Sequence, residues 1–141
     1  MPEPIKSNVV FEDLSARFQS TQAVAASPAL AAETIIASLT LNTDEAIVSG
    51  IMLRGFAAFT VGTSGTAVTF RIRRTNVSGT VVANTGALTG GITAGNLVAE
   101  TILGFDTGAA LTGQTYVLTM QVTAGAAAST VSAVEFDALI V

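Results

Sequence analysis

The chain has 141 residues, of which only 11% are charged, and it contains neither histidine nor cysteine. Soluble domains average about 25% charged residues, so this chain has too few charges to cover its own surface. Contact with other subunits is the simplest way to cover the rest. The missing residue types exclude histidine-based triads, thiol chemistry and cysteine-based zinc sites. A net charge of −4 argues against a nucleic-acid partner, which needs a basic surface.

Residues 1–32 are expected to form an N-terminal arm that contains all three prolines of the chain. Phe11, Leu14 and Phe18 recur with the spacing of one face of a short helix. A helix this short is not stable alone, so its apolar face must dock either on its own domain or on a neighbour. The candidates for partner contact in the arm are Ile5, Val9, Val10, Phe11, Leu14 and Phe18.

After residue 32 the apolar residues alternate with a period of two, which is typical of β-strands. Strands are expected over 34–41, 47–61, 68–73, 80–83, 97–105, 115–123 and 130–141, with turns rich in glycine, threonine and serine between them. Seven to nine strands at a spacing of about ten residues predict an all-β domain over residues 33–141. We expect an antiparallel β-sandwich of the jelly-roll or another Greek-key type.

The alternation also predicts which side chains face the core. In the first strand the buried face is expected to hold Ile35, Ala37, Leu39 and Leu41. The segment 47–61 is too long for one flat strand, so Gly50 or Gly55 is expected to mark a bulge or a bend.

The clearest alternation lies between residues 68 and 73. Its buried face is expected to hold Val68, Phe70 and Ile72. Arg71 and Arg73 share the opposite face, where they could meet acidic groups of a partner. The alternative is a solvated face whose charges discourage edge-to-edge pairing.

Glu135 and Asp137 are the one carboxylate pair that suggests catalysis. They are two residues apart on an expected strand, so they share a face at a separation of about 7 Å. Some sandwich glycosidases use alternating acids in this way, but here Leu139 follows on that face and the chain has no tryptophan. We therefore expect a solvated outer face, no catalysis, and no cofactor or metal site.

An apolar arm joined to a charge-poor β domain rich in glycine, threonine and alanine resembles the head-decoration (cement) proteins of tailed bacteriophages that have a jelly-roll-type domain. The resemblance is one of composition and organisation, and it extends over the whole chain. It implies a structural virion protein on the capsid exterior, a homotrimer whose arms reach neighbouring subunits or the major capsid protein. No functional residue is carried over, because no diagnostic motif is present.

The N-terminal segment and the apolar stretches bear on localisation. Residues 1–8 carry one lysine and two glutamates and are unlike a secretory signal, so we expect synthesis in the host cytoplasm. The apolar segment 47–61 is shorter than the roughly 18 residues that a membrane span needs, so no membrane partner is expected. The alternative function is a trimeric β-sandwich module, such as a fibre tip or a lectin-like domain, that binds a receptor or a glycan. An enzyme ranks third.

Overall fold

The computed structural model describes residues 18–23, 31–41, 49–62, 67–89, 92–107, 113–123 and 130–141. These ranges contain eight β-strands: β1 (Phe18–Ala23), β2 (Glu33–Thr40), β3 (Ile51–Thr60), β4 (Val68–Arg74), β5 (Val81–Asn84), β6 (Leu97–Asp106), β7 (Thr115–Val122) and β8 (Thr130–Ile140). Over the same ranges the chain forms no helix with the length and apolar character of a membrane span. The prediction of an all-β domain is confirmed.

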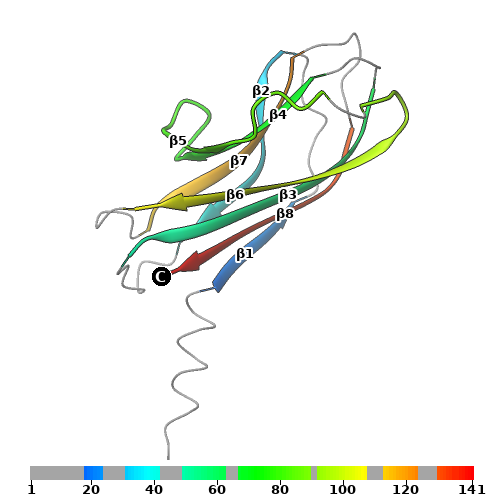
Figure 1. Ribbon diagram of the computed structural model, residues 1–141. Helices are drawn as coiled ribbons and strands as arrows, with labels where there is room; N and C mark the ends of the chain where they lie inside the picture. Colours follow the sequence, from blue (N-terminus) through cyan, green and yellow to red (C-terminus); the bar gives the residue numbers. More distant parts are fainter. Residues whose placement is uncertain are drawn as a thin grey trace, which may run out of the picture.

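The strands form two antiparallel four-stranded sheets that pack face to face (Figure 1). Sheet A has the order β1-β8-β3-β6, and sheet B has the order β2-β7-β4-β5. The pairing is nested, because β1 pairs with β8, β2 with β7, β3 with β6 and β4 with β5. Eight strands paired in this nested way and divided between two sheets form a jelly roll. The predicted antiparallel sandwich is thus confirmed.

The sandwich includes residues that the sequence pattern assigns to the N-terminal arm. Residues 18–23 form β1 at the edge of sheet A, where Phe18 lies opposite Leu139 and Ala23 opposite Val134. Phe18 therefore belongs to a strand and not to the expected helix, since pairing with β8 supplies the backbone hydrogen bonds that an isolated short helix lacks. The rest of that helix, at residues 11–17, lies outside the described residues.

Alternate side chains of both sheets fill the space between them. Val68, Phe70 and Ile72 are buried, as the alternation predicts, and so are the even positions of β7 and, from Val134 on, of β8. The rings of Phe59 in sheet A and Phe70 in sheet B lie 5.8 Å apart at an angle of 52°, within the range that favours tilted aromatic pairs. The core therefore joins the two sheets directly.

In β2 the predicted phase is wrong for one residue. Ala37, Leu39 and Leu41 are buried as expected, but Ile35 is exposed and Ile36 is buried in its place. The register with β7 shifts between Ile35 and Ala37. A bulge of this kind inserts one residue and exchanges the two faces of the strand, which simple alternation does not anticipate.

The two glycines near β3 have different roles. Gly50 precedes the strand with a φ of +155°, and a side chain there would collide with the backbone oxygen of Asp106. Gly55 lies in a stretch of β3 without a shift of register, so there is no bulge at this glycine. A Cβ at Gly55 would come within 2.7 Å of the Leu118 side chain, so this glycine makes room for the facing sheet. The register of β3 with β8 shifts only after Ala58.

Candidate interaction surface

The outer face of sheet A is defined by its register, because residues directly opposite each other in an antiparallel pair lie on the same face. The first row across this face, at the end where β1 begins, consists of Phe18, Leu139, Met52 and Phe105. The next row, two residues further along each strand, consists of Ser20, Asp137, Arg54 and Leu103. Apolar side chains thus make up the whole first row and flank the second at β6.

This face exposes most of the large apolar side chains that the described residues leave in solvent. Eight such side chains are exposed in the described ranges, and five of them lie on the outer face of sheet A. These five are 50–72% exposed: Phe18, Met52, Leu97, Leu103 and Phe105. Single exposed apolar residues are ordinary, but a group on one face indicates a surface that another molecule covers.

A hollow of about 390 Å³ lies on this face. Its apolar lining comes from Phe18, Met52, Leu103 and Leu139, and its polar lining comes from Arg54 and Asp137. The hollow therefore offers an apolar site with one ion pair in its lining, which suits a side chain of another protein better than a polar metabolite.

The polar pair in the hollow is an arginine that neutralises a buried acid. Asp137 is 4% exposed, and its Oδ2 atom accepts hydrogen bonds from Arg54 Nε at 2.7 Å and from Arg54 Nη2. Glu135 lies 3.6 Å from Arg54 Nη2 and remains partly in solvent. Asp137 Oδ1 has no hydrogen-bond partner within the described part of the chain. The expectation of a solvated face is therefore wrong for Asp137, which is buried. Arg54 supplies the opposite charge that a buried carboxylate requires.

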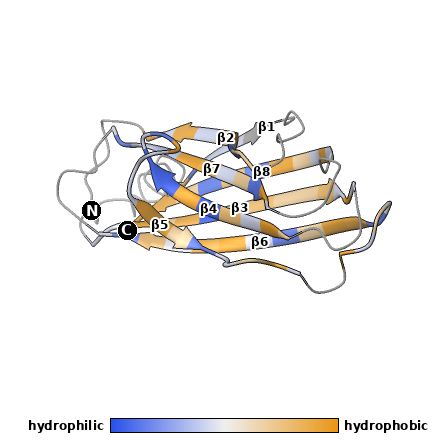
Figure 2. Cartoon of the chain, turned by 90° about the horizontal axis from the view of Figure 1, so that it is seen from above, coloured by the Kyte–Doolittle hydropathy of each residue, from blue (hydrophilic) through white to orange (hydrophobic). Residues whose placement is uncertain are grey.

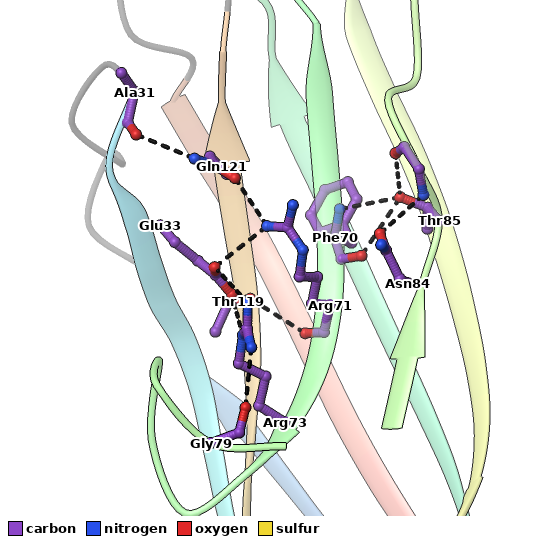
Figure 3. A network of polar contacts seen from close by, with 11 residues as sticks. Ala31, Glu33, Phe70, Arg71, Arg73, Gly79, Asn84, Thr85, Thr119 and Gln121 are labelled. Atoms are coloured by element: carbon purple, nitrogen blue, oxygen red, sulfur yellow. Dashed lines mark hydrogen bonds and ion pairs between the residues drawn. The ribbon is translucent and has the colours of Figure 1, made fainter. Parts of the chain in front are cut away.

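The outer face of sheet B is polar, and its charges meet within the chain (Figure 3). Glu33 in β2 accepts hydrogen bonds from Arg73 Nε at 2.7 Å and from Thr119 Oγ1 at 2.6 Å, and Arg71 Nη1 lies 3.2 Å from it. Burial alone would raise the pKa of Glu33, but the hydrogen bonds from Arg73 and Thr119 and the two positive charges outweigh it and lower the pKa. Glu33 is therefore held as a carboxylate.

The sequence-predicted contact residues fall into three groups. Arg71 and Arg73 lie on the outer face of sheet B, as the alternation predicts, but the acid that they meet is Glu33 of the same chain. Phe18 lines the hollow on sheet A. The remaining candidates lie outside the described residues: Ile5, Val9, Val10, Phe11 and Leu14. Their contact with a partner stays a prediction.

A third polar cluster joins the two sheets. Asp106 at the end of β6 is buried and accepts hydrogen bonds from Arg74 Nε at 2.7 Å and from the Tyr116 hydroxyl at 2.8 Å. Burial alone would raise the pKa of Asp106, but these two hydrogen bonds outweigh it and lower the pKa. Burial, followed by the hydrogen bond to Asp106, raises the pKa of Tyr116 far above its ordinary value. An acid held charged and a phenol held protonated tie β6 to β4 and β7 and exchange no protons near neutral pH.

The sequence reasoning missed the apolar residues that β6 presents on the outer face of sheet A, namely Leu97, Leu103 and Phe105. They occupy alternate positions, so the periodicity placed them on one face of the strand. Glu100 lies on the opposite, inward-facing track. Glu100 was the available signal. A charged residue at an inward position shows that hydrophobicity alone does not decide which face of β6 is buried.

The nested strand order defines the chain as a jelly-roll β-sandwich. No protein-family model matches it, and no curated protein matches it in sequence. Among solved structures it is similar to the VP2 subviral particle of infectious bursal disease virus, with 14% identity and a TM-score of 0.57 over 88% of this chain. It is also similar to the Gx strain of that virus, with 15% identity and a TM-score of 0.53. The chain spans about a third of the length of these chains, and the likeness is one of fold.

Within the described ranges there is no group of three or more acidic side chains that could hold a metal ion. The ion pairs of those ranges instead form three separate clusters, which are centred on Asp137, Glu33 and Asp106. Each cluster pairs a carboxylate with an arginine. These clusters join strands of the sandwich by ion pairs. The outer face of sheet A is therefore the best candidate for a functional surface.

Proposed function

We propose that this chain is a structural protein of a virus particle, a non-catalytic decoration protein that sits on the capsid exterior. In this proposal it binds copies of itself and the major capsid protein. The observation that carries the proposal is the outer face of sheet A, where a charge-poor jelly roll exposes five large apolar side chains together. The fold likeness to VP2 in a subviral particle supports the same class of protein.

The physical argument concerns the kind of surface that attachment needs. A cementing contact requires a broad surface that loses water easily, and few charges on that surface reduce the cost of desolvation. On the outer face of sheet A, Arg54 already neutralises Asp137. A partner can therefore cover this face without supplying a charge of its own for that pair.

The N-terminal segment has a separate role in the proposal. Residues 1–17 precede β1 and contain the apolar residues Ile5, Val9, Val10, Phe11 and Leu14. Burial of an apolar side chain of this size contributes about 1.5–3 kcal/mol, so several of them together could anchor a subunit after the entropy of ordering is met. We assign this segment to attachment on the capsid.

The test is binding of the purified protein to empty capsids of the virus that encodes it. The full chain should co-sediment with capsids, and deletion of residues 1–17 should weaken this binding by at least about 30-fold. The truncation must end before Phe18, since β1 pairs with β8 and its removal would leave an edge of sheet A unpaired. Circular dichroism should show an intact β-sandwich in the truncated protein.

Two outcomes would count against the proposal. A folded full-length protein that does not bind capsids would remove the decoration role. Binding to a glycan or receptor in the absence of any capsid binding would favour the alternative recognition module instead.

A further inference from the structure

We infer that the outer face of sheet A is a contact surface between two copies of this chain, which meet face to face across a two-fold axis. The inference rests on the self-association in the proposed function and names the surface that carries it. It predicts a dimer contact, whereas the resemblance to decoration proteins implies a trimer.

The size of the face fits a second copy. Strands β3 and β6 have 10 residues each, and four strands at a spacing of about 4.8 Å with a rise of about 3.3 Å per residue present roughly 600 Å². Two copies would then bury about 1,200 Å² in total, the lower end of specific interfaces. Four of the five exposed apolar side chains lie in the first two rows, and Leu97 lies at the far end of β6. A partner must therefore be as long as the face to cover all five.

The charges of the face are compatible with a copy of itself. Two copies of a chain with a net charge of −4 repel each other, so the surface that joins them must be close to neutral. On this face Arg54 lies between Asp137 and Glu135, so one positive charge is set against two negative charges. These three groups carry a net charge of −1, a small part of the charge of the chain.

The face also carries complementary polar groups, which a two-fold contact requires because each copy uses the same surface. Asp137 Oδ1 lacks a donor within the described residues. The side chain of Arg54 is half exposed, and the bonds to Asp137 use only its Nε and Nη2 atoms, out of the five N–H donors that a guanidinium carries. Arg54 can therefore donate further hydrogen bonds to acceptors of the second copy.

Shape complementarity follows from the same rows. The hollow lies beside Met52 and Leu139, and Leu103 is the most exposed of the large apolar side chains on the face. In a two-fold dimer every contact occurs twice. If Leu103 of one copy enters the hollow of the other, Leu103 of the other copy also enters the hollow of the first. Leu103 is thus expected to fill the hollow of the other copy, and side chains that fill a pocket contribute most to binding.

The experiment is sedimentation velocity of the full chain over a series of concentrations, together with two matched variants. The unsubstituted protein should sediment as a dimer that dissociates on dilution. Leu103→Glu should raise the dissociation constant at least about 30-fold, as expected for a residue that fills a pocket of the partner. Ile35→Glu is the control, because Ile35 is an exposed apolar residue in a strand of sheet B, and it should leave the dissociation constant unchanged.

Chemical cross-linking provides a second measurement that does not depend on a destabilising charge. The chain has no cysteine, so an introduced thiol is the only one that reacts with a bis-maleimide linker. Leu103→Cys should give a covalent dimer, and Ile35→Cys should not. Circular dichroism of all four variants should match the unsubstituted protein, since both positions are exposed.

The inference is overturned if the full chain remains monomeric up to its solubility limit. It is equally overturned if the chain forms a trimer that Leu103→Glu leaves intact and whose thiols at position 103 do not cross-link. The capsid test is separate: a Leu103→Glu monomer that still binds capsids leaves the proposed function in place. A dimer that does not bind capsids leaves the contact surface in place and removes the decoration role.

Discussion

The outer faces of the two sheets differ in the side chains that they present to solvent. On sheet B, Glu33 collects hydrogen bonds from Arg73 and Thr119 and a charge contact from Arg71, so the polar groups of this face are satisfied within one chain. On sheet A, one ion pair lies among large exposed apolar side chains. Figure 2 shows the contrast in the strands, with β4 ending in a strongly hydrophilic stretch and β3 and β6 hydrophobic along much of their length. The polar groups of the outer face of sheet B are satisfied within the chain, whereas the outer face of sheet A leaves large apolar side chains in solvent.

The magnitudes explain why the difference matters for assembly. Covering one large apolar side chain contributes about 1.5–3 kcal/mol, whereas association costs about 4–15 kcal/mol in lost freedom of movement. Five exposed side chains on one face reach the range of that cost, whereas one or two fall below it. Sheet B exposes Ile35 and Val81 among its strands, which places it below that threshold.

The largest expected effect separates the inner faces of the sheets from the outer ones. Phe70→Ala should lower the free energy of unfolding by about 3–5 kcal/mol, because it leaves a cavity in the core. Phe105→Ala, on the outer face of sheet A, should lower it by less than about 1 kcal/mol at concentrations where the chain is monomeric. Urea denaturation measures both. Equal effects would mean that the outer face of sheet A belongs to the fold of one chain.

The next prediction compares a glutamate on each outer face. Glu33→Gln should lower the free energy of unfolding by about 1–3 kcal/mol, since the bonds from Arg73 and Thr119 are made to a charged acceptor in a partly buried network. Glu135→Gln on sheet A should change it by no more than about 0.5 kcal/mol, because its ion pair with Arg54 is long and exposed. Denaturation at neutral pH tests the pair, and a larger loss for Glu135→Gln would reverse the comparison.

Acid should act on the network of sheet B through the same carboxylate. The pKa of Glu33 is lowered from its ordinary value of 4.5 in the folded chain, so the folded state binds this proton more weakly than the unfolded state does. Its contribution to stability is therefore present above about pH 4.5 and is lost as the pH falls through the folded pKa. Glu33→Gln should show a shallower loss of stability over this acid range than the unsubstituted protein. Identical pH profiles would show that the network does not stabilise the charged form.

The last comparison concerns the ion pair in the hollow. Replacing both partners by apolar residues, Arg54→Met with Asp137→Leu, should change the free energy of unfolding by less than about 1 kcal/mol. The single change Arg54→Met should be more damaging than the double change, because it leaves the buried Asp137 carboxylate without its counter-charge. Thermal denaturation of the three proteins measures the difference. A double variant less stable than Arg54→Met would contradict the interpretation of Asp137 as a neutralised acid.

Some elements could be predicted from the sequence with their faces correctly assigned. The strand around Phe70 alternates between apolar and polar residues, and its predicted buried positions Val68, Phe70 and Ile72 are buried. β1 was not predicted, because residues 18–23 carry no apolar alternation strong enough to indicate a strand. That strand exists because β8 offers it an edge with which to pair, and an edge more than 100 residues away in the sequence leaves no local signal.

The sequence by itself determined that the chain is an all-β sandwich with few charges and no histidine or cysteine chemistry, because periodicity and composition are local properties that folding cannot change. Only the tertiary structure decided which track of β6 faces solvent, since Leu97, Leu103 and Phe105 alternate with Val98 and Ile102 and both tracks are apolar. It also decided which charges meet. Arg73 pairs with Glu33, 40 residues away in the sequence, and Arg54 pairs with Asp137, 83 residues away. Pairings over such sequence separations depend on strand order, which no local pattern encodes.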